Sequence, residues 1–217
     1  MNLERLYSHR FEDKDNTPIW KEICLFFNKK FISKEDIICD VACGNGEFIN
    51  NINAHVKYGV DLRKSKELKN NIHFLQKNVL NLKAEDFEAG VPNVFFMSNF
   101  LEHLGNKSEV FDLFCSIKNI LINSEKEKKS IIILGPNIDY VKEKYWDFFD
   151  HTLPFNNKSI AEGLYSAGFK IDCSIDKFLP YTTKSCIPQH RLLVKMYLKM
   201  NFMWKILGKQ FLVIGGV

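Results

Sequence analysis

Short apolar runs alternate with amphipathic stretches along the chain. Five runs have the composition and length of buried strands, at residues 37–41, 57–61, 72–75, 94–98 and 130–134. Apolar residues at helical spacing predict helices at residues 17–31, 47–53, 107–122 and 157–167. Because parallel neighbouring strands need crossover helices, this order favours an α/β fold with a largely parallel sheet covered on both faces.

The last part of the chain has a different pattern. An aromatic segment at residues 140–155 is expected to be a solvated loop. A strand is predicted at residues 169–178, one helix at residues 190–207 ended by Gly208, and a last strand at residues 209–214. We therefore divide the chain into an N-terminal helical cap (1–35) and a main domain (36–217), with residues 179–208 as a helical insertion before the last strand.

The composition is that of an ordinary globular protein. Of the 217 residues, 46% are hydrophobic and 26% are charged, which excludes disordered and fibrous classes. The first fifteen residues are charged where a signal peptide needs an apolar stretch, and we expect a cytoplasmic protein. The six cysteines show no metal-binding spacing, so we predict no metal and reduced thiols.

Charge is distributed unevenly along the chain. None of the 26 acidic residues lies after Asp176, whereas seven of the 30 basic residues do. The first 176 residues therefore carry a net −3 (23 basic, 26 acidic) and the last 41 carry +7. Such a basic segment attracts phosphorylated substrates, membrane surfaces or nucleic acid, although a solvated helix face is an equal alternative.

The segment Asp40-Val-Ala-Cys-Gly44-Asn-Gly46 joins the first strand to the next predicted helix. Glycines at 44 and 46 allow a tight turn and a close approach to a ligand, and a helix N-terminus after them would favour an anionic group. Asp61 ends the second strand, where an acid can accept hydrogen bonds from both ribose hydroxyls of a nucleoside. Together these residues predict a pocket for an adenosine-like ligand.

Two cofactor classes fit this pocket. The dinucleotide fingerprint requires a third glycine where this chain has Ile49, which counts against NAD. Asp40 would repel a pyrophosphate but suits a ligand that carries an ammonium and a sulfonium group. The residues therefore favour S-adenosylmethionine.

Residues 36–178 resemble the class I S-adenosylmethionine-dependent methyltransferases of the small-molecule branch. DVACGNGEF is similar to their first motif, with Ala42 where many members have glycine, and YGVDL and SNFLEHL are similar to their second and fourth strand ends. The resemblance implies a Rossmann-like, doubly wound, seven-stranded sheet of order 3-2-1-4-5-7-6 with strand 7 antiparallel. Residues 178–213 resemble the tail of methyltransferases that modify bacterial surface polysaccharides and sugars.

The resemblance also implies roles for individual residues. Asp40 would lie near the ammonium group, Gly44 and Gly46 against the methionine part, and Asp61 on the ribose. The full set expected to bind the cofactor is Asp40, Ala42, Gly44, Gly46, Asp61, Leu62, Asn78, Val79, Asn99 and Phe100. Asn78 departs from the aspartate that is common at its position, but an amide can still bond to the adenine edge.

Methyl transfer to a hydroxyl calls for a general base, and the candidates are His103 and His151. Packing, capping or loop hydrogen bonds are the alternatives for both, and Glu102 is assigned a structural or solvent role. The residues expected to bind the acceptor are Tyr7, Arg10, Tyr181, Lys184, His190 and Arg191. A surface location is the alternative for Tyr7 and Arg10, and helix-surface or packing roles are the alternatives for the other four.

The predicted function is O-methylation of a small polar acceptor, such as a sugar, a nucleotide-activated sugar or a phosphate-linked decoration in surface-polysaccharide biosynthesis. The alternatives are a nucleotide-dependent oxidoreductase and a non-enzymatic protein that binds a membrane or a partner. Nucleic acid is not expected as a partner, because SNFLEHL stands where base methyltransferases carry N-P-P-Y. Membrane contact is allowed but not favoured, and the protein is expected to be a monomer or a homodimer.

Overall fold

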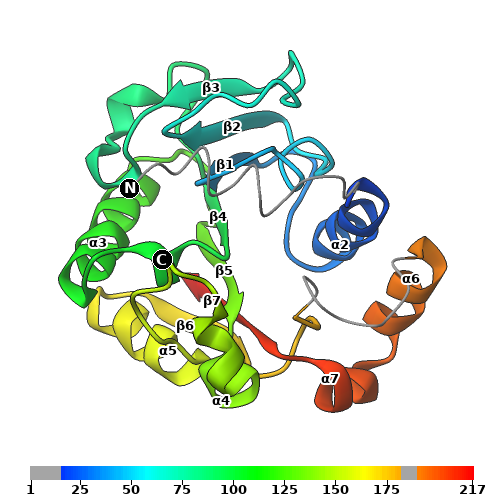
Figure 1. Ribbon diagram of the computed structural model, residues 1–217. Coiled ribbons are helices and arrows are strands. Elements are labelled where there is room, and N and C mark those ends of the chain that lie inside the picture. The colour runs from blue at the N-terminus through cyan, green and yellow to red at the C-terminus, as the bar shows by residue number, and fades with distance from the viewer. Residues whose placement is uncertain (1–15, 182–189) are drawn as a thin grey trace.

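The computed structural model describes residues 16–181 and 190–217, which form one seven-stranded sheet with helices on both faces (Figure 1). The strands lie in the order β3-β2-β1-β4-β5-β7-β6, as predicted. Their bounds are β1 Ile37–Val41, β2 Val56–Asp61, β3 His73–Gln76, β4 Val94–Ser98, β5 Ser130–Pro136, β6 Lys170–Ile175 and β7 Gln210–Gly216.

The strand directions confirm the predicted Rossmann-like, doubly wound α/β class. Strands β1 to β5 pair in parallel, whereas β7 runs antiparallel to both β5 and β6. Central strands β4 and β5 are buried along almost their whole length, which explains why their sequences are nearly continuous apolar runs.

Two sets of helices cover the sheet (Figure 1). Helices α3 and α5 pack on one face, and α2, α6 and α7 pack on the other. Successive side chains of a strand point to opposite faces, so in β1 Cys39 belongs to the first core and Ile38 to the second. The helices are α2 Thr17–Lys30, α3 Lys107–Ile122, α5 Asn157–Ser166, α6 Arg191–Lys199 and α7 Asn201–Leu207.

The helix predicted at residues 47–53 is wrong, because the structure has a series of turns there. Asparagine amides compete for the backbone carbonyls that a helix would use. Asn51 Nδ2 donates to Glu47 O at 2.7 Å, and Asn50 Nδ2 donates to Glu67 O at 2.9 Å. The predicted anion site at a helix N-terminus after Gly46 is therefore absent.

The segment at residues 140–155 is only partly the solvated loop that we predicted: Trp146 and Phe149 are exposed, whereas other residues are buried. It begins within the short helix α4 (Ile138–Val141) and contains the 3₁₀ turn η4 (Lys142–Asp147). Tyr145 is fully buried and donates its hydroxyl to Leu153 O at 2.7 Å, and Asp150 and Phe155 are buried as well. The segment is therefore part of the packed domain.

The C-terminal region has the predicted order of elements, but β6 is shorter than the strand predicted at residues 169–178 and β7 is Gln210–Gly216 instead of residues 209–214. The single helix predicted at residues 190–207 is broken at Met200 into α6 and α7, and Gly208 follows α7 as expected. Strand β5 also continues to Pro136 instead of ending at Leu134, because Gly135 and Pro136 pair with β7. Pairing with β7 therefore keeps Gly135 and Pro136 in the strand, although the sequence predicted that they would end it.

The division into a cap and a main domain remains a prediction, since residues 1–15 lie outside the described part of the chain. Within the described part, α2 packs against α6 and against the sheet. Among the residues described, we find no helix both long enough and apolar enough to span a bilayer.

Candidate active site

A cavity of about 1550 Å³ opens at the carboxyl ends of β1, β2 and β4. In doubly wound sheets, ligands bind at this edge, next to the point where the strand order reverses. Here β1 lies between β2 and β4, so the chain after each of these strands contributes to one hollow. Helices α2 and α6 supply the apolar wall opposite the strand ends, through residues such as Trp20 and Met196.

The turn after β1 lies against this cavity. Ala42 and Gly44 have φ values of 56° and 54°, in the left-handed region that favours glycine. A Cβ at Gly44 would meet no atom within 4 Å, so the backbone there is open to a ligand. The positive φ of Ala42 gives a physical reason for the glycine that similar sequences carry at this position.

Gly46 has a different role from the one predicted. It does not line the cavity. Its φ is 81°, and a Cβ there would lie 2.6 Å from Leu68 Cδ2 and 3.0 Å from Asn50 Nδ2. Gly46 therefore allows the turn to pack closely against the segment that follows β2.

Asp61 connects the end of β2 to the turn after β1. Its Oδ2 accepts a hydrogen bond from Gly44 N at 3.0 Å, and its Oδ1 accepts one from Arg63 N at 3.1 Å. Each carboxylate oxygen has a second lone pair, and Asp61 lines the cavity. The residue can therefore hold the turn and accept hydrogen bonds from a ligand at the same time.

Two further carboxyl groups, Asp40 and Glu47, also line this end of the cavity. Burial, reinforced by the nearby charges of Glu47 and Asp61, raises the pKa of Asp40 well above its usual range. Burial also raises the pKa of Glu47. A cation bound between these groups would favour their ionised forms, so the electrostatics suit a positively charged ligand.

The remaining residues predicted to bind the cofactor also line the cavity: Leu62, Asn78, Val79, Asn99 and Phe100. Asn78 caps the 3₁₀ turn η1 (Val79–Asn81), and its Oδ1 accepts a hydrogen bond from Leu80 N at 3.0 Å. Asn99 has a φ of 50° and donates its backbone N–H to Leu134 O at 3.1 Å, which fixes the chain as it leaves β4. Nine of the ten predicted residues thus surround one cavity, with Gly46 as the exception.

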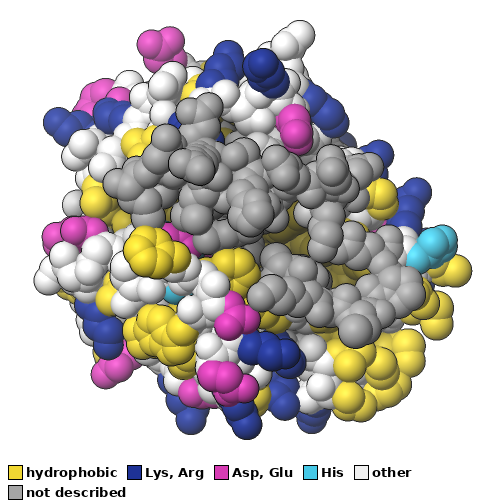
Figure 2. Space-filling view, viewed as in Figure 1, with side chains coloured by type: hydrophobic (Ala, Val, Ile, Leu, Met, Phe, Trp, Pro, Cys, Tyr) yellow, Lys and Arg dark blue, Asp and Glu magenta, His cyan; other side chains and the backbone are white. Residues whose placement is uncertain are grey.

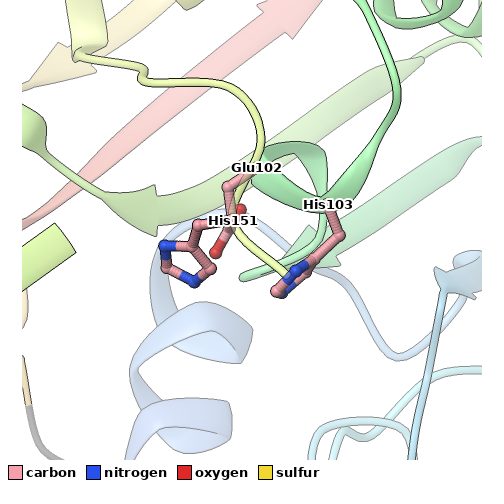
Figure 3. Close-up of side chains that lie close together, drawn as sticks. All are labelled: Glu102, His103 and His151. Carbon is pink, nitrogen blue, oxygen red and sulfur yellow. The ribbon is translucent and has the colours of Figure 1, made fainter. Parts of the chain in front are cut away.

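At the other side of the cavity, Glu102, His103 and His151 converge (Figure 3). A potential ligand atom of each lies within 4.8 Å of those of the other two. Glu102 and His103 come from the 3₁₀ turn η3 (Leu101–His103) after β4, and His151 comes from the segment before α5. The structure therefore brings both predicted histidines together, with ring centroids 5.0 Å apart.

Backbone hydrogen bonds hold these two segments together. Glu102 O accepts hydrogen bonds from Thr152 N at 2.8 Å and Leu153 N at 3.2 Å. His103 Nδ1 lies 3.0 Å from Asp150 O and 3.3 Å from Asp150 Oδ2. Because Asp150 is buried, it can fix the orientation of the His103 ring.

Glu102, for which the sequence predicted a structural or solvent role, lies in the wall of the cavity. It is only 3% exposed, it lines the cavity, and burial raises its pKa to about 7. Its position directly before His103, a few residues after a predicted strand whose carboxyl end borders the site, was the signal available in the sequence. The burial itself depends on contacts with residues about fifty positions away.

The predicted acceptor residues have mixed outcomes. Tyr181 lines the cavity, whereas Tyr7, Arg10 and Lys184 lie outside the described residues. His190 caps α6 by accepting a hydrogen bond from Leu192 N, and it does not line the cavity. Arg191 Nε lies 2.5 Å from the buried carboxylate of Glu22, so this arginine pairs with α2 instead of facing the cavity.

No family model and no curated protein matches this sequence, but solved structures match its fold. A SAM-dependent methyltransferase from Archaeoglobus fulgidus aligns over 100% of both chains at 16% identity, with a TM-score of 0.63. The plantazolicin methyltransferase BpumL, in complex with SAH, aligns over 98% of this chain and 89% of its own at 14% identity, with a TM-score of 0.61.

A possible histamine N-methyltransferase from Thermotoga maritima aligns over 92% of this chain and 90% of its own, at 12% identity and a TM-score of 0.60. All three proteins are described as methyltransferases, and the strand order with its antiparallel β7 is the one that the family resemblance implied. The chain therefore has the class I fold of the S-adenosylmethionine-dependent methyltransferases.

Proposed function

We propose that this protein is an S-adenosylmethionine-dependent methyltransferase. The observation that carries the proposal is the arrangement of Asp61 and Gly44 at the carboxyl edge of the sheet. There a carboxylate that can accept hydrogen bonds from ribose hydroxyls and an open backbone turn line one cavity. The fold, shared with methyltransferases along nearly the whole chain, supports the same reading.

In this proposal the cofactor lies across the ends of β1, β2 and β4. Asp61 accepts the ribose hydroxyls, and Gly44 allows the methionine part to approach the backbone. The buried carboxyl of Asp40 faces the ammonium group, whose positive charge offsets the cost of burying an anion. Asn78 and Val79 contact the adenine, while Asn99 and Phe100 lie beside the methyl group.

The transfer itself is a displacement at the methyl carbon. An acceptor oxygen donates an electron pair to that carbon, the carbon–sulfur bond breaks with its electron pair moving to sulfur, and the acceptor proton passes to a base, for which His103 and His151 are the candidates. Correct positioning accounts for about 7–11 kcal/mol of barrier reduction in well-oriented reactions. Glu102, His103 and His151 are the polar groups proposed to face the reacting oxygen.

We further propose a small hydroxyl-bearing acceptor, such as a sugar or an activated sugar of surface-polysaccharide biosynthesis. The resemblance of residues 178–213 to the tail of sugar-modifying methyltransferases supports this choice. We do not propose that Arg191 binds a phosphate group of the acceptor, because this arginine is paired with Glu22. A screen of sugars and nucleotide-sugars, with amines and peptides as comparison acceptors, tests it by the SAH released.

Thermal-shift titration separates the proposed cofactor from NAD. SAH and S-adenosylmethionine should raise the melting temperature in a concentration-dependent way, because a ligand that binds only the folded state stabilises it. NAD should have no effect. Stabilisation by NAD alone would favour the oxidoreductase alternative and remove the methyltransferase proposal.

One surface supports a second role, as a peripheral contact with anionic membranes. Apolar side chains that do not line the cavity remain exposed over α6 and α7, at the lower right of Figure 2: Leu192, Phe202 and Ile206. Exposed lysines, Lys195, Lys199 and Lys205, accompany them. Helices with an apolar face and a basic face bind anionic lipid interfaces.

Co-sedimentation with vesicles tests this second role. The protein should bind vesicles that contain phosphatidylserine at low salt and release them at high salt, because the attraction is screened. A Lys195→Ala/Lys199→Ala double variant should bind less, while a Lys107→Ala/Lys158→Ala variant, with both lysines exposed on the helices that cover the opposite face of the sheet, serves as the charge-matched control. Equal binding by all three proteins, or no binding at all, excludes the role.

A further inference from the structure

The cluster of Glu102, His103 and His151 contains the donor set of a catalytic metal site. Two imidazoles and one carboxylate are the protein ligands of several catalytic zinc and non-haem iron centres. In this cluster the candidate donor atoms all lie within 4.8 Å of one another. Figure 3 shows the three side chains converging on one point from two different segments of the chain.

Residues around the cluster hold its side chains in place, as is usual around metal ligands. His103 contacts Asp150 through Nδ1, which directs its Nε2 atom away from Asp150. A carboxylate or carbonyl on the second nitrogen is the usual outer partner of a metal-bound histidine. Asp150 and Glu102 are exposed by only 5% and 3%, so this support is built into the interior.

We propose that Glu102, His103 and His151 bind one divalent transition-metal cation, such as Zn²⁺ or Mn²⁺, beside the cofactor cavity. Three protein ligands leave at least one coordination position open for an acceptor oxygen. Bonds of about 2.0–2.2 Å require the donor atoms to move somewhat closer together, which side-chain rotation allows. The proposal rests on the proposed methyltransferase function, and it adds a metal ion to the part of the cavity where the acceptor would bind.

The cation would act on the acceptor before methyl transfer. An acceptor hydroxyl bound to the metal loses its proton more readily, and that proton passes to solvent water. The acceptor oxygen would then form the bond to the methyl carbon, and the electron pair of the broken carbon–sulfur bond would move to sulfur. The metal would also fix the acceptor in line with the sulfonium, which is the positioning that methyl transfer requires.

The proposal is tested by measuring metal binding directly, without an activity assay. The protein is untagged and is first freed of metal with a chelator. Zn²⁺ and Mn²⁺ are titrated by calorimetry in the absence of cofactor. We expect one site per chain for at least one of the cations. Affinity should fall at least tenfold in His151→Ala and in Glu102→Gln, since each removes one of three ligands, and should be unchanged in the exposed control His55→Ala.

Two further measurements make the outcome decisive. Thermal unfolding and SAH binding identify any variant that has lost its fold. The metal proposal would be overturned if neither Zn²⁺ nor Mn²⁺ bound the wild-type protein. It would also be overturned if the cations bound wild type, His151→Ala and Glu102→Gln with equal affinity. If metal-free wild-type protein binds SAH in that case, only the metal proposal fails; if it does not bind SAH, the proposed function fails separately.

Discussion

Among single residues, Asp61 is the one on which cofactor binding should depend most. Replacing it by Asn removes the charge but keeps one oxygen acceptor for Gly44 N or for the ribose. A hydrogen bond to a charged group contributes about 1.5–3 kcal/mol, so Asp61→Asn should weaken SAH binding at least tenfold. Calorimetry measures this, with Asp112→Asn on the exposed surface of α3 as the matched control. A loss below threefold would contradict the assignment.

Asp86 offers a test of pH dependence away from the cavity. Burial alone would raise its pKa, but hydrogen bonds from Lys77 Nζ at 2.7 Å and Lys83 N at 2.8 Å outweigh burial and lower it. A carboxyl group whose folded-state pKa is depressed stabilises the protein above its unfolded pKa and loses that contribution as pH falls through the folded pKa. Asp86→Asn should therefore reduce the free energy of unfolding at pH 7 by less than about 1 kcal/mol.

The same difference should shrink when the measurement is made at pH 3. Urea denaturation of wild type and Asp86→Asn at both pH values checks this, and Glu85→Gln in the same turn controls for a general charge effect. A difference that stays constant or grows toward low pH would show that the Lys77–Asp86 pair does not act as described.

Residues whose roles depend on nearby sequence could be predicted, and those that depend on distant contacts could not. Asp40 and Asp61 follow from their places at strand ends, so both were found. Glu102 is buried by the segment around Thr152, and Arg191 is held by Glu22, 169 positions away. No local pattern reports such pairings, which explains why one was overlooked and the other was expected to bind the acceptor.

At the level of elements, the turn after β1 shows how two glycines can have different tasks. Both have positive φ, so alanine at either position incurs backbone strain of about 1–2 kcal/mol. Only at position 46 would the new Cβ also clash with Leu68 and Asn50. Gly46→Ala should therefore destabilise the protein more than Gly44→Ala in urea denaturation, whereas Gly44→Ala should weaken SAH binding more. Equal losses of stability would refute this division.

The pair of helices α6 and α7 is anchored by Trp204. Its indole is buried, donates Nε1 to Tyr197 O at 3.0 Å, and packs against Phe178 with ring centroids 4.9 Å apart. Trp204→Ala should cost about 3–5 kcal/mol of stability, as is typical for deleting a buried aromatic side chain. Phe202→Ala, in the same helix but 57% exposed, should change stability by about 0.5 kcal/mol or less. Similar unfolding midpoints for the two variants would contradict the packing.

For the whole molecule, the order of apolar runs carried most of the information about the sheet. Strands β1 and β4 were predicted with their observed bounds, and so was α3, because continuous apolar runs and a regular amphipathic helix leave strong signals. Strand β6 was predicted too long, since it alternates between exposed and half-buried residues and a bulge interrupts its pairing with β7. The strand order came from the family resemblance, and the pairing register came only from the structure.

Calorimetric titration of the purified wild-type chain with SAH tests the central claim most directly. A cavity bordered by Asp40, Gly44 and Asp61 should bind one SAH per chain, and Asp61→Asn should weaken that binding at least tenfold while the fold is retained. The absence of any saturable heat from a folded, monodisperse sample would contradict the claim that this sheet edge binds S-adenosylmethionine.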